Sequence, residues 1–136
     1  FAVLRHRVHR ADIGRLAAIA SEEILYPEIA RCLAFKGAEI FCHSSSEIGS
    51  PLATAKDSAK RARAFENAAY VVSANTAGIS GSALPLMSAD GNSQIVAPSG
   101  KLLAQSGSGE TFTAFAEIDI AHLREQRRQH HDAEMG

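Results

Sequence analysis

Two segments of the sequence are apolar at nearly every position, and they constrain the fold more than any other feature. They are LAAIA at residues 16–20 and YVVSA at residues 70–74. Successive residues of a strand point to opposite faces of a sheet, so a strand that is apolar throughout needs cover on both faces. We therefore expect a layered α/β structure with these strands inside it.

Strands and helices alternate in the first half of the chain. The apolar runs predict strands over residues 13–20, 38–42 and 69–74. A helix is predicted between the first two strands, because Pro27 suits a first helical turn and Gly37 suits a helix end. Residues 43–50 are predicted as a loop, followed by a second helix that is capped at Ser50 and Pro51 and runs to about Asn67.

The second half of the chain is predicted to form a hairpin and a polar end. Residues 75–92 are rich in Gly and Ser and predict a long loop at the rim of a site. Strands over residues 94–97 and 102–105 flank a turn at residues 98–101. Alternation predicts a last strand over residues 111–118, and Asp119 is expected to cap a short final helix.

The predicted elements leave one face of the sheet without cover. Two crossover helices can cover one face of such a sheet. No second set of elements for the opposite face is found in the 136 residues. The chain therefore looks like half of a sandwich, and we expect its open face to be buried by an N-terminal half of the same protein or by a second copy.

Composition argues against nucleic acid and membranes as partners and indicates the redox compartment. The net charge of −1 creates no overall field toward nucleic acid or an anionic membrane. No apolar run approaches the roughly 20 residues that span a bilayer. Cys32 and Cys42 make no disulfide framework, so we expect a reduced, cytoplasmic protein. Phe1 is an unusual first residue, and we expect further sequence upstream of it.

Candidate chemistry begins in the stretch IASEEILYPE, residues 19–28. Ser21 follows a buried strand, precedes two glutamates and stands shortly before the helix that begins at Pro27. An α/β enzyme often places its nucleophile at such a point, where a strand passes into a helix. The residue type alone leaves open whether Ser21 is a nucleophile or only the end of a strand.

Several other reactive side chains have simpler structural interpretations. Cys42 and His43 are neighbours in a strand and point to opposite faces, which argues against a Cys/His dyad. Cys32 lies on the apolar side of its helix and is expected in the core. No metal site is expected, because no companion ligands accompany the histidines at positions 6, 9, 130 and 131.

The second helix is expected to pack through small residues. Its predicted packing face is formed by Ala55, Ala59 and Ala62. The opposite face is expected to be solvated and carries Lys56, Lys60, Arg61 and Arg63. Glu66 and Asn67 are expected to tie the helix end to a loop and not to contact a substrate.

Four motifs in chain order resemble the carbon–nitrogen hydrolase, or nitrilase, superfamily. From Ser21 the chain reads SEEILYPEIARCLAFKGAEIF, where the family has Cys-x-x-x-x-[FY]-Pro-Glu and a helix ending in Lys-Gly-Ala-Glu. RAFEN stands before YVVSAN, GNSQIVAPSG follows at residues 91–100, and EID at residues 117–119 precedes Arg127. The resemblance implies that residues 1–136 are the C-terminal portion of a single carbon–nitrogen hydrolase domain, half of a four-layer α-β-β-α sandwich, with the N-terminal half absent from this chain.

The same resemblance implies hydrolysis of non-peptide C–N bonds in small amides or nitriles. The family uses a Glu-Lys-Cys triad and no cofactor: the glutamate is the general base, the cysteine attacks, and the lysine with a backbone N–H stabilises the developing charge. By this resemblance Ser21 holds the nucleophile position and the N–H of Glu22 faces the oxyanion. Glu23, His43 and Ser44 are possible pocket residues. The triad glutamate and lysine would lie upstream of this chain, and a homo-oligomer is expected.

A serine at the nucleophile position has three interpretations. It is an engineered replacement that traps substrate, a natural residue in a branch that lost or altered the reaction, or a working nucleophile. A hydroxyl stays protonated unless a well-aligned base takes its proton, whereas a thiol gives some thiolate near neutral pH. The rival class is a non-catalytic binding module, while a flavodoxin-like domain would need a Gly-rich phosphate loop that SEEILYPE does not provide.

Overall fold

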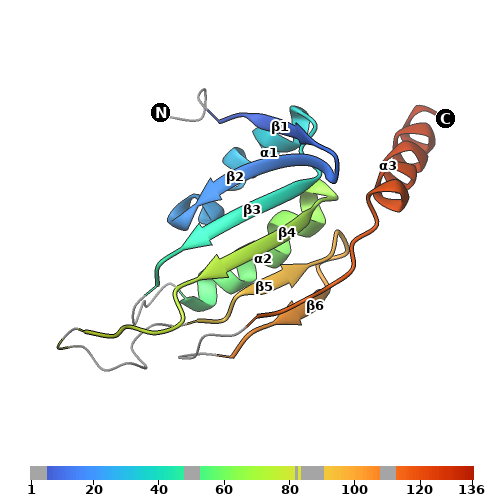
Figure 1. Cartoon of the computed structure of the whole chain (residues 1–136). Coiled ribbons are helices and arrows are strands. Elements are labelled where there is room, and N and C mark those ends of the chain that lie inside the picture. The colour runs from blue at the N-terminus through green and yellow to red at the C-terminus, as the bar shows by residue number, and fades with distance from the viewer. Residues whose placement is uncertain (1–5, 48–52, 82, 84–90, 108–112) are drawn as a thin grey trace.

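One mixed sheet of six strands forms the centre of the structure (Figure 1). The computed structural model describes residues 6–47, 53–81, 83, 91–107 and 113–136. The strand order is β1-β2-β3-β4-β5-β6; β2, β3 and β4 are parallel, and each other neighbouring pair is antiparallel. The bounds are β1 (Val8–Ala11), β2 (Gly14–Ala20), β3 (Ile40–Ser45), β4 (Tyr70–Asn75), β5 (Gln94–Val96) and β6 (Leu102–Gln105).

Two crossover helices lie on one face of this sheet (Figure 1). The helical elements are the 3₁₀ turn η2 (Ser21–Leu25), α1 (Pro27–Phe35), α2 (Ala53–Asn67) and α3 (Ile120–Met135). Helix α1 connects β2 to β3, and α2 connects β3 to β4, which confirms the predicted order. Pro27 begins α1, and Gly37 ends it with a φ of 95° and an N–H···O bond of 2.8 Å to Ala34. The predicted cap at Ser50 and Pro51 lies outside the described residues.

The main core fills the space between the sheet and helices α1 and α2. Phe41 and Val71 from the sheet are fully buried against Leu33 of α1 and Ala64 of α2. Ile19 joins the same cluster from β2. Each large side chain of this kind contributes roughly 1.5–3 kcal/mol on burial, and this cluster is the larger of the two hydrophobic clusters among the described residues.

The opposite face is covered only in part. Leu123 of α3 packs on Ile40 and Tyr70 at the amino ends of β3 and β4. Further along the strands, a row of paired residues that runs across the sheet is exposed at Ala18, Cys42 and Val72. The mixed sheet therefore has one packed face and one largely open face, as expected for half of a four-layer sandwich.

Strand β1 was not predicted from the sequence, and one predicted strand is not formed. β1 reads VHRA and carries exposed polar side chains, so it lacks an apolar run. It is an edge strand, where charged residues are common because only one neighbour is paired. Residues 113–118 form no strand, although their exposure alternates as predicted, because no strand of the described sheet pairs with them. Residues 111 and 112 of that predicted strand lie outside the described residues.

Two other predicted elements have the wrong length. The final helix α3 has 16 residues and is not short, although Asp119 does cap it by accepting the N–H of His122 at 2.8 Å. Strand β3 continues through His43 and Ser44 to Ser45, where a loop was predicted. These polar residues stay in the sheet because they pair with Ser73, Ala74 and Asn75 of β4.

The buried and exposed faces of α2 and α1 also differ from the predicted ones. Ala55 and Ala62 are exposed, whereas Ala59 is buried. Three basic residues predicted to be solvated are instead buried: Lys56, Lys60 and Arg63. Cys32 was expected in the core of α1 but is exposed.

Candidate active site

The chain turns sharply at Ser21, directly after β2. Ser21 has a φ of 43°, in the left-handed region that residues other than glycine rarely adopt. The strand ends at Ala20 and η2 begins at Ser21, so the strained residue is the junction itself. Backbone strain of this kind, about 1–3 kcal/mol per residue, persists only where surrounding contacts hold it, and it is concentrated at functional sites.

Two side chains hold this junction from its ends. Oε2 of Glu23 accepts the N–H of Ala20 at 2.8 Å, which is the backward half of a capping box. The same oxygen lies 3.1 Å from Nε2 of His6. Burial alone would raise the pKa of Glu23, but the Ala20 N–H and His6 outweigh it and lower the pKa. At the other end Arg63 Nε donates to the carbonyl of Ile24 at 3.0 Å.

A third contact reaches the carbonyl of Ser21 from the neighbouring strand β3. The His43 side chain is 2% exposed, and its Nε2 lies 2.9 Å from the carbonyl oxygen of Ser21. Its Nδ1 lies 2.8 Å from Oγ of Ser73. Burial is the main cause that lowers the pKa of His43, and the nearby charges of Lys60 and Lys56 lower it further. The imidazole is therefore favoured in its neutral form.

An open cavity of about 380 Å³ lies beside this junction. Glu23 and Ser44, two of the predicted pocket residues, line it together with Ala20. Its basic lining comes from His6, Arg7 and His9, next to and within β1. His43, the third predicted pocket residue, is not in this lining; it borders a separate space of about 20 Å³ on the helix side.

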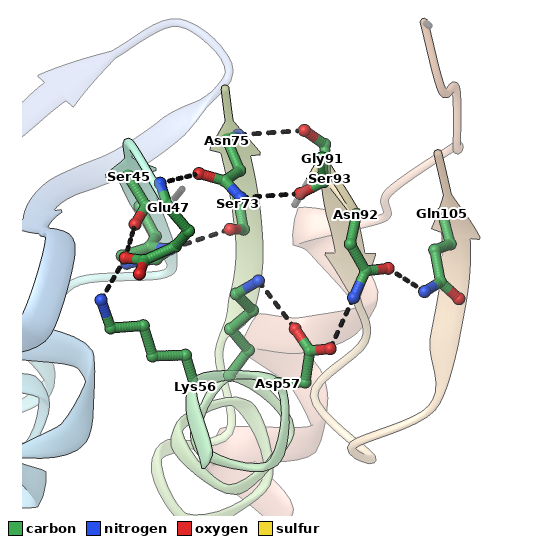
Figure 2. Close-up of polar contacts among 12 residues, drawn as sticks. Ser45, Glu47, Lys56, Asp57, Ser73, Asn75, Gly91, Asn92, Ser93 and Gln105 are labelled. Carbon is green, nitrogen blue, oxygen red and sulfur yellow. Dashed lines mark hydrogen bonds and ion pairs between the residues drawn. The ribbon is translucent and has the colours of Figure 1, made fainter. Parts of the chain in front are cut away.

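The helix side of the sheet also holds a polar cluster that sequence reasoning missed (Figure 2). Lys56 pairs with Glu47, and Nζ of Lys60 lies 3.0 Å from Oδ1 of Asp57. Asp57 also accepts from the side chain of Asn92. The spacing of Lys56, Lys60 and Arg63 could have indicated this cluster. Residues three and four positions apart lie on one face of a helix.

Asn75 ties this cluster to the strand ends. Its Oδ1 accepts the N–H of Glu47 at 2.9 Å, and its Nδ2 donates to the carbonyl of Gly91 at 2.8 Å (Figure 2). Its own N–H donates to Oγ of Ser93 at 3.0 Å. One asparagine therefore joins the segment after β3 to the segment before β5.

The family model described as carbon-nitrogen hydrolase matches residues 4–128. The chain belongs to the carbon–nitrogen hydrolase family. An omega-amidase of Xenopus laevis is 33% identical over 107 residues, which is 79% of this chain and 37% of that protein. The chloroplastic omega-amidase of Arabidopsis thaliana is 32% identical over 117 residues, 86% of this chain and 30% of that protein.

A solved structure shows the same architecture in a longer carbon–nitrogen hydrolase. The carbon–nitrogen hydrolase of Helicobacter pylori G27 is 28% identical, with a TM-score of 0.74, over 87% of this chain and 44% of that one. This chain thus spans less than half the length of the relatives it matches. The half-sandwich architecture inferred from the apolar strands agrees with that ratio.

The other motifs shared with the carbon–nitrogen hydrolases have structural contacts. In RAFEN, Arg63 pairs with Glu66 at 2.5 Å, and the Asn67 carbonyl accepts from Arg127 at 3.3 Å. Arg127 also donates to the carbonyls of Ala38 and Ala68 at 2.8 and 2.9 Å.

Among the described residues, no helix has the length and apolar character needed to cross a membrane.

Proposed function

We propose that this chain is the C-terminal portion of a single carbon–nitrogen hydrolase domain that binds a small amide at residue 21. The observation that carries the proposal is the strained junction at Ser21, which lies between β2 and η2 next to a 380 Å³ cavity. The names of the two omega-amidase relatives favour amides over nitriles as the substrate class. In such a site the residue 21 side chain would attack the amide carbon, and the Glu22 N–H would stabilise the oxyanion.

The proposal includes that this chain alone is inactive, because residue 21 is a serine and the triad glutamate and lysine would lie upstream. His43 is the histidine bonded to Ser21, but its Nε2 donates to the Ser21 carbonyl and so cannot accept a proton from the hydroxyl. A carboxylate of the kind that serves a cysteine in this family is a weak base for an alcohol. The alternative function is a non-catalytic binding module that keeps the pocket, and the same cavity supports it.

The proposal includes a second layer over the open face. An N-terminal half of the same protein, which would also bring the triad glutamate and lysine, is the proposed cover, and a second copy of the chain is the alternative. Both cysteines are free, which fits a reducing cytoplasm. No cofactor is part of the proposed reaction.

The first prediction is that this 136-residue chain releases no ammonia from amides, nitriles or N-carbamoyl compounds. The reason is that residue 21 carries a hydroxyl and that no base among the described residues is bonded to it. Ammonia assays over a panel of aliphatic and aromatic substrates measure this, with Ser21→Ala as the matched variant. Turnover above buffer that disappears in Ser21→Ala would show that Ser21 is a working nucleophile.

The second prediction tests the site in the full-length protein. Ser21→Cys should form a covalent adduct on residue 21 with amide substrates, because a thiol can act where the hydroxyl cannot. The swap is nearly isosteric and should change the free energy of unfolding by less than about 1.5 kcal/mol. Mass spectrometry of the peptide that carries residue 21 detects the adduct, and Cys32 is the internal control. If residue 21 stays unmodified although the upstream glutamate and lysine are present, the binding-module alternative is correct.

A further inference from the structure

We propose that His43, oriented by Ser73, is a positioning residue that holds the backbone of residue 21 in the conformation needed for attack. This inference rests on the proposed function, because it assigns a role within the same site. It links three elements: β4 supplies Ser73, β3 supplies His43, and the carbonyl that accepts the bond belongs to the first residue of η2.

The direction of the two hydrogen bonds follows from the acceptor. A backbone carbonyl can only accept, so Nε2 of His43 must carry the proton in the 2.9 Å contact with Ser21. In a neutral imidazole the other nitrogen is then an acceptor, and the hydroxyl of Ser73 donates to Nδ1 at 2.8 Å. The Ser21 carbonyl therefore selects the tautomer, and the Ser73 hydroxyl satisfies the nitrogen that remains an acceptor.

The charges around His43 favour this neutral donor. From α2, Lys56 and Lys60 act against a positive imidazole, while Glu47, after β3, acts in the opposite sense. Glu47 is paired with Lys56 (Figure 2). Lys60 is paired with Asp57, so the charged side chains on this side are held by partners. A protonated His43 would also lose the acceptor that Ser73 now uses.

The backbone at residue 21 needs such a contact. A φ of 43° at a serine is strained, and a buried hydrogen bond to the strained residue offsets part of that strain. Glu23 and Arg63 bind the neighbouring residues Ala20 and Ile24, whereas His43 binds the strained residue itself.

The test uses the full-length protein with Ser21→Cys and measures the rate of adduct formation at residue 21. His43→Phe keeps a ring but removes both nitrogens, and His43→Gln keeps an N–H donor of similar reach. We expect His43→Phe to slow adduct formation about tenfold, the equivalent of one hydrogen bond of about 1.4 kcal/mol, and His43→Gln to recover most of that loss. Ser73→Ala should give an intermediate rate, and His130→Phe, an exposed site on α3, should leave the rate unchanged.

Folding is monitored for each variant by thermal unfolding, and iodoacetamide labelling of Cys32 reports on the rest of the molecule. A folded His43→Phe variant that reacts as fast as its parent would overturn the proposal. So would equal losses in His43→Phe and His43→Gln, because a structural role would show no rescue.

Failure of the proposed function is recognised separately. If Ser21→Cys forms no amide adduct even with His43 intact, the proposed amide chemistry at residue 21 fails, and the positioning role is then decided by NMR. Nitrogen shifts of His43 should show the Nε2–H tautomer, with a coupling across the hydrogen bond to the Ser21 carbonyl. The backbone couplings of Ser21 should lose their left-handed values in His43→Phe. An Nδ1–H tautomer, or unchanged couplings in a folded variant, would refute the role of His43.

Discussion

At the scale of single residues, the balance between burial and hydrogen bonding sets the acid–base behaviour of the site. His43 is enclosed by the sheet and α2, and desolvation is the largest cause of its lowered pKa. Glu23 shows the opposite balance, because its hydrogen bonds to Ala20 and His6 outweigh the burial that would raise its pKa. The neutral histidine and the ionised glutamate both act on the backbone around Ser21, so the junction is held by two groups of different charge.

The third prediction concerns the dependence of stability on pH. Because the pKa of His43 is lowered from 6.5 in the folded chain, the unfolded chain binds more protons as the pH falls through 6.5. The contribution of His43 to the free energy of unfolding should therefore be complete above that pH and decline below it. Urea unfolding between pH 7.5 and 5.5 measures the slope, which should be smaller in His43→Gln and unchanged in His130→Gln. Equal slopes in parent and His43→Gln would contradict the burial of a neutral imidazole.

At the scale of elements, α3 is attached to the sheet through its first half. Arg127 donates to three backbone carbonyls, those of Ala38, Asn67 and Ala68. Arg124 makes a two-point contact with Glu39 at 2.6 and 3.0 Å, and this contact is the main cause of the lowered pKa of that carboxyl. The contacts gather at the amino ends of β3 and β4, the end of the sheet opposite to Ser21. Figure 1 shows the rest of α3 projecting away from the sheet.

The fourth prediction tests this attachment. Arg127→Lys should destabilise the chain by about 1–3 kcal/mol. The compact ammonium of lysine cannot reach all the carbonyls that the planar guanidinium of arginine reaches, so buried acceptors would be left unpaired. Arg128→Lys is the matched control, since Arg128 is exposed and pairs with Glu125 one turn away. Its effect should stay below about 0.5 kcal/mol. Chemical denaturation measures both variants. Equal effects would mean that the carbonyl contacts of Arg127 contribute nothing specific.

At the scale of the whole molecule, the helices among the described residues cover one face of the sheet and only part of the other. The exposed row of Ala18, Cys42 and Val72 crosses the central parallel strands on the side away from α1 and α2. Contiguous exposed apolar patches of more than a few hundred Å² are rare on monomers and mark interaction surfaces. The two omega-amidase relatives are more than twice as long as the segment that matches this chain.

The fifth prediction is that the isolated chain associates through this face. Light scattering should show dimers or larger species. Val72→Lys should shift the population toward monomer, because it places a charge in the centre of the face, at a folding cost of at most about 1 kcal/mol. Ala55→Lys, on the exposed side of α2, should leave the association state unchanged. A monomeric parent chain with sharp, dispersed NMR signals would refute the prediction.

The sequence determined the features that depend on neighbours within a few residues. Pro27 begins a helix and Gly37 ends it because each has a backbone preference of its own, and the apolar runs become parallel strands because their pattern needs cover on both faces. The same reasoning located the half-sandwich and the junction at Ser21. It failed at residues 113–118, where an alternating pattern has no strand to pair with.

Only the tertiary structure decided which polar residues are buried and what they hold. Lys56 is inside because Glu47 meets it there, and Arg63 is inside because it binds the Ile24 carbonyl, 39 positions away. His43 donates to Ser21 because β2 and β3 are paired in one register and Ser73 approaches from β4. A buried charge or a chosen tautomer depends on partners distant in the chain, and local propensity and periodicity carry no information about partners at that distance.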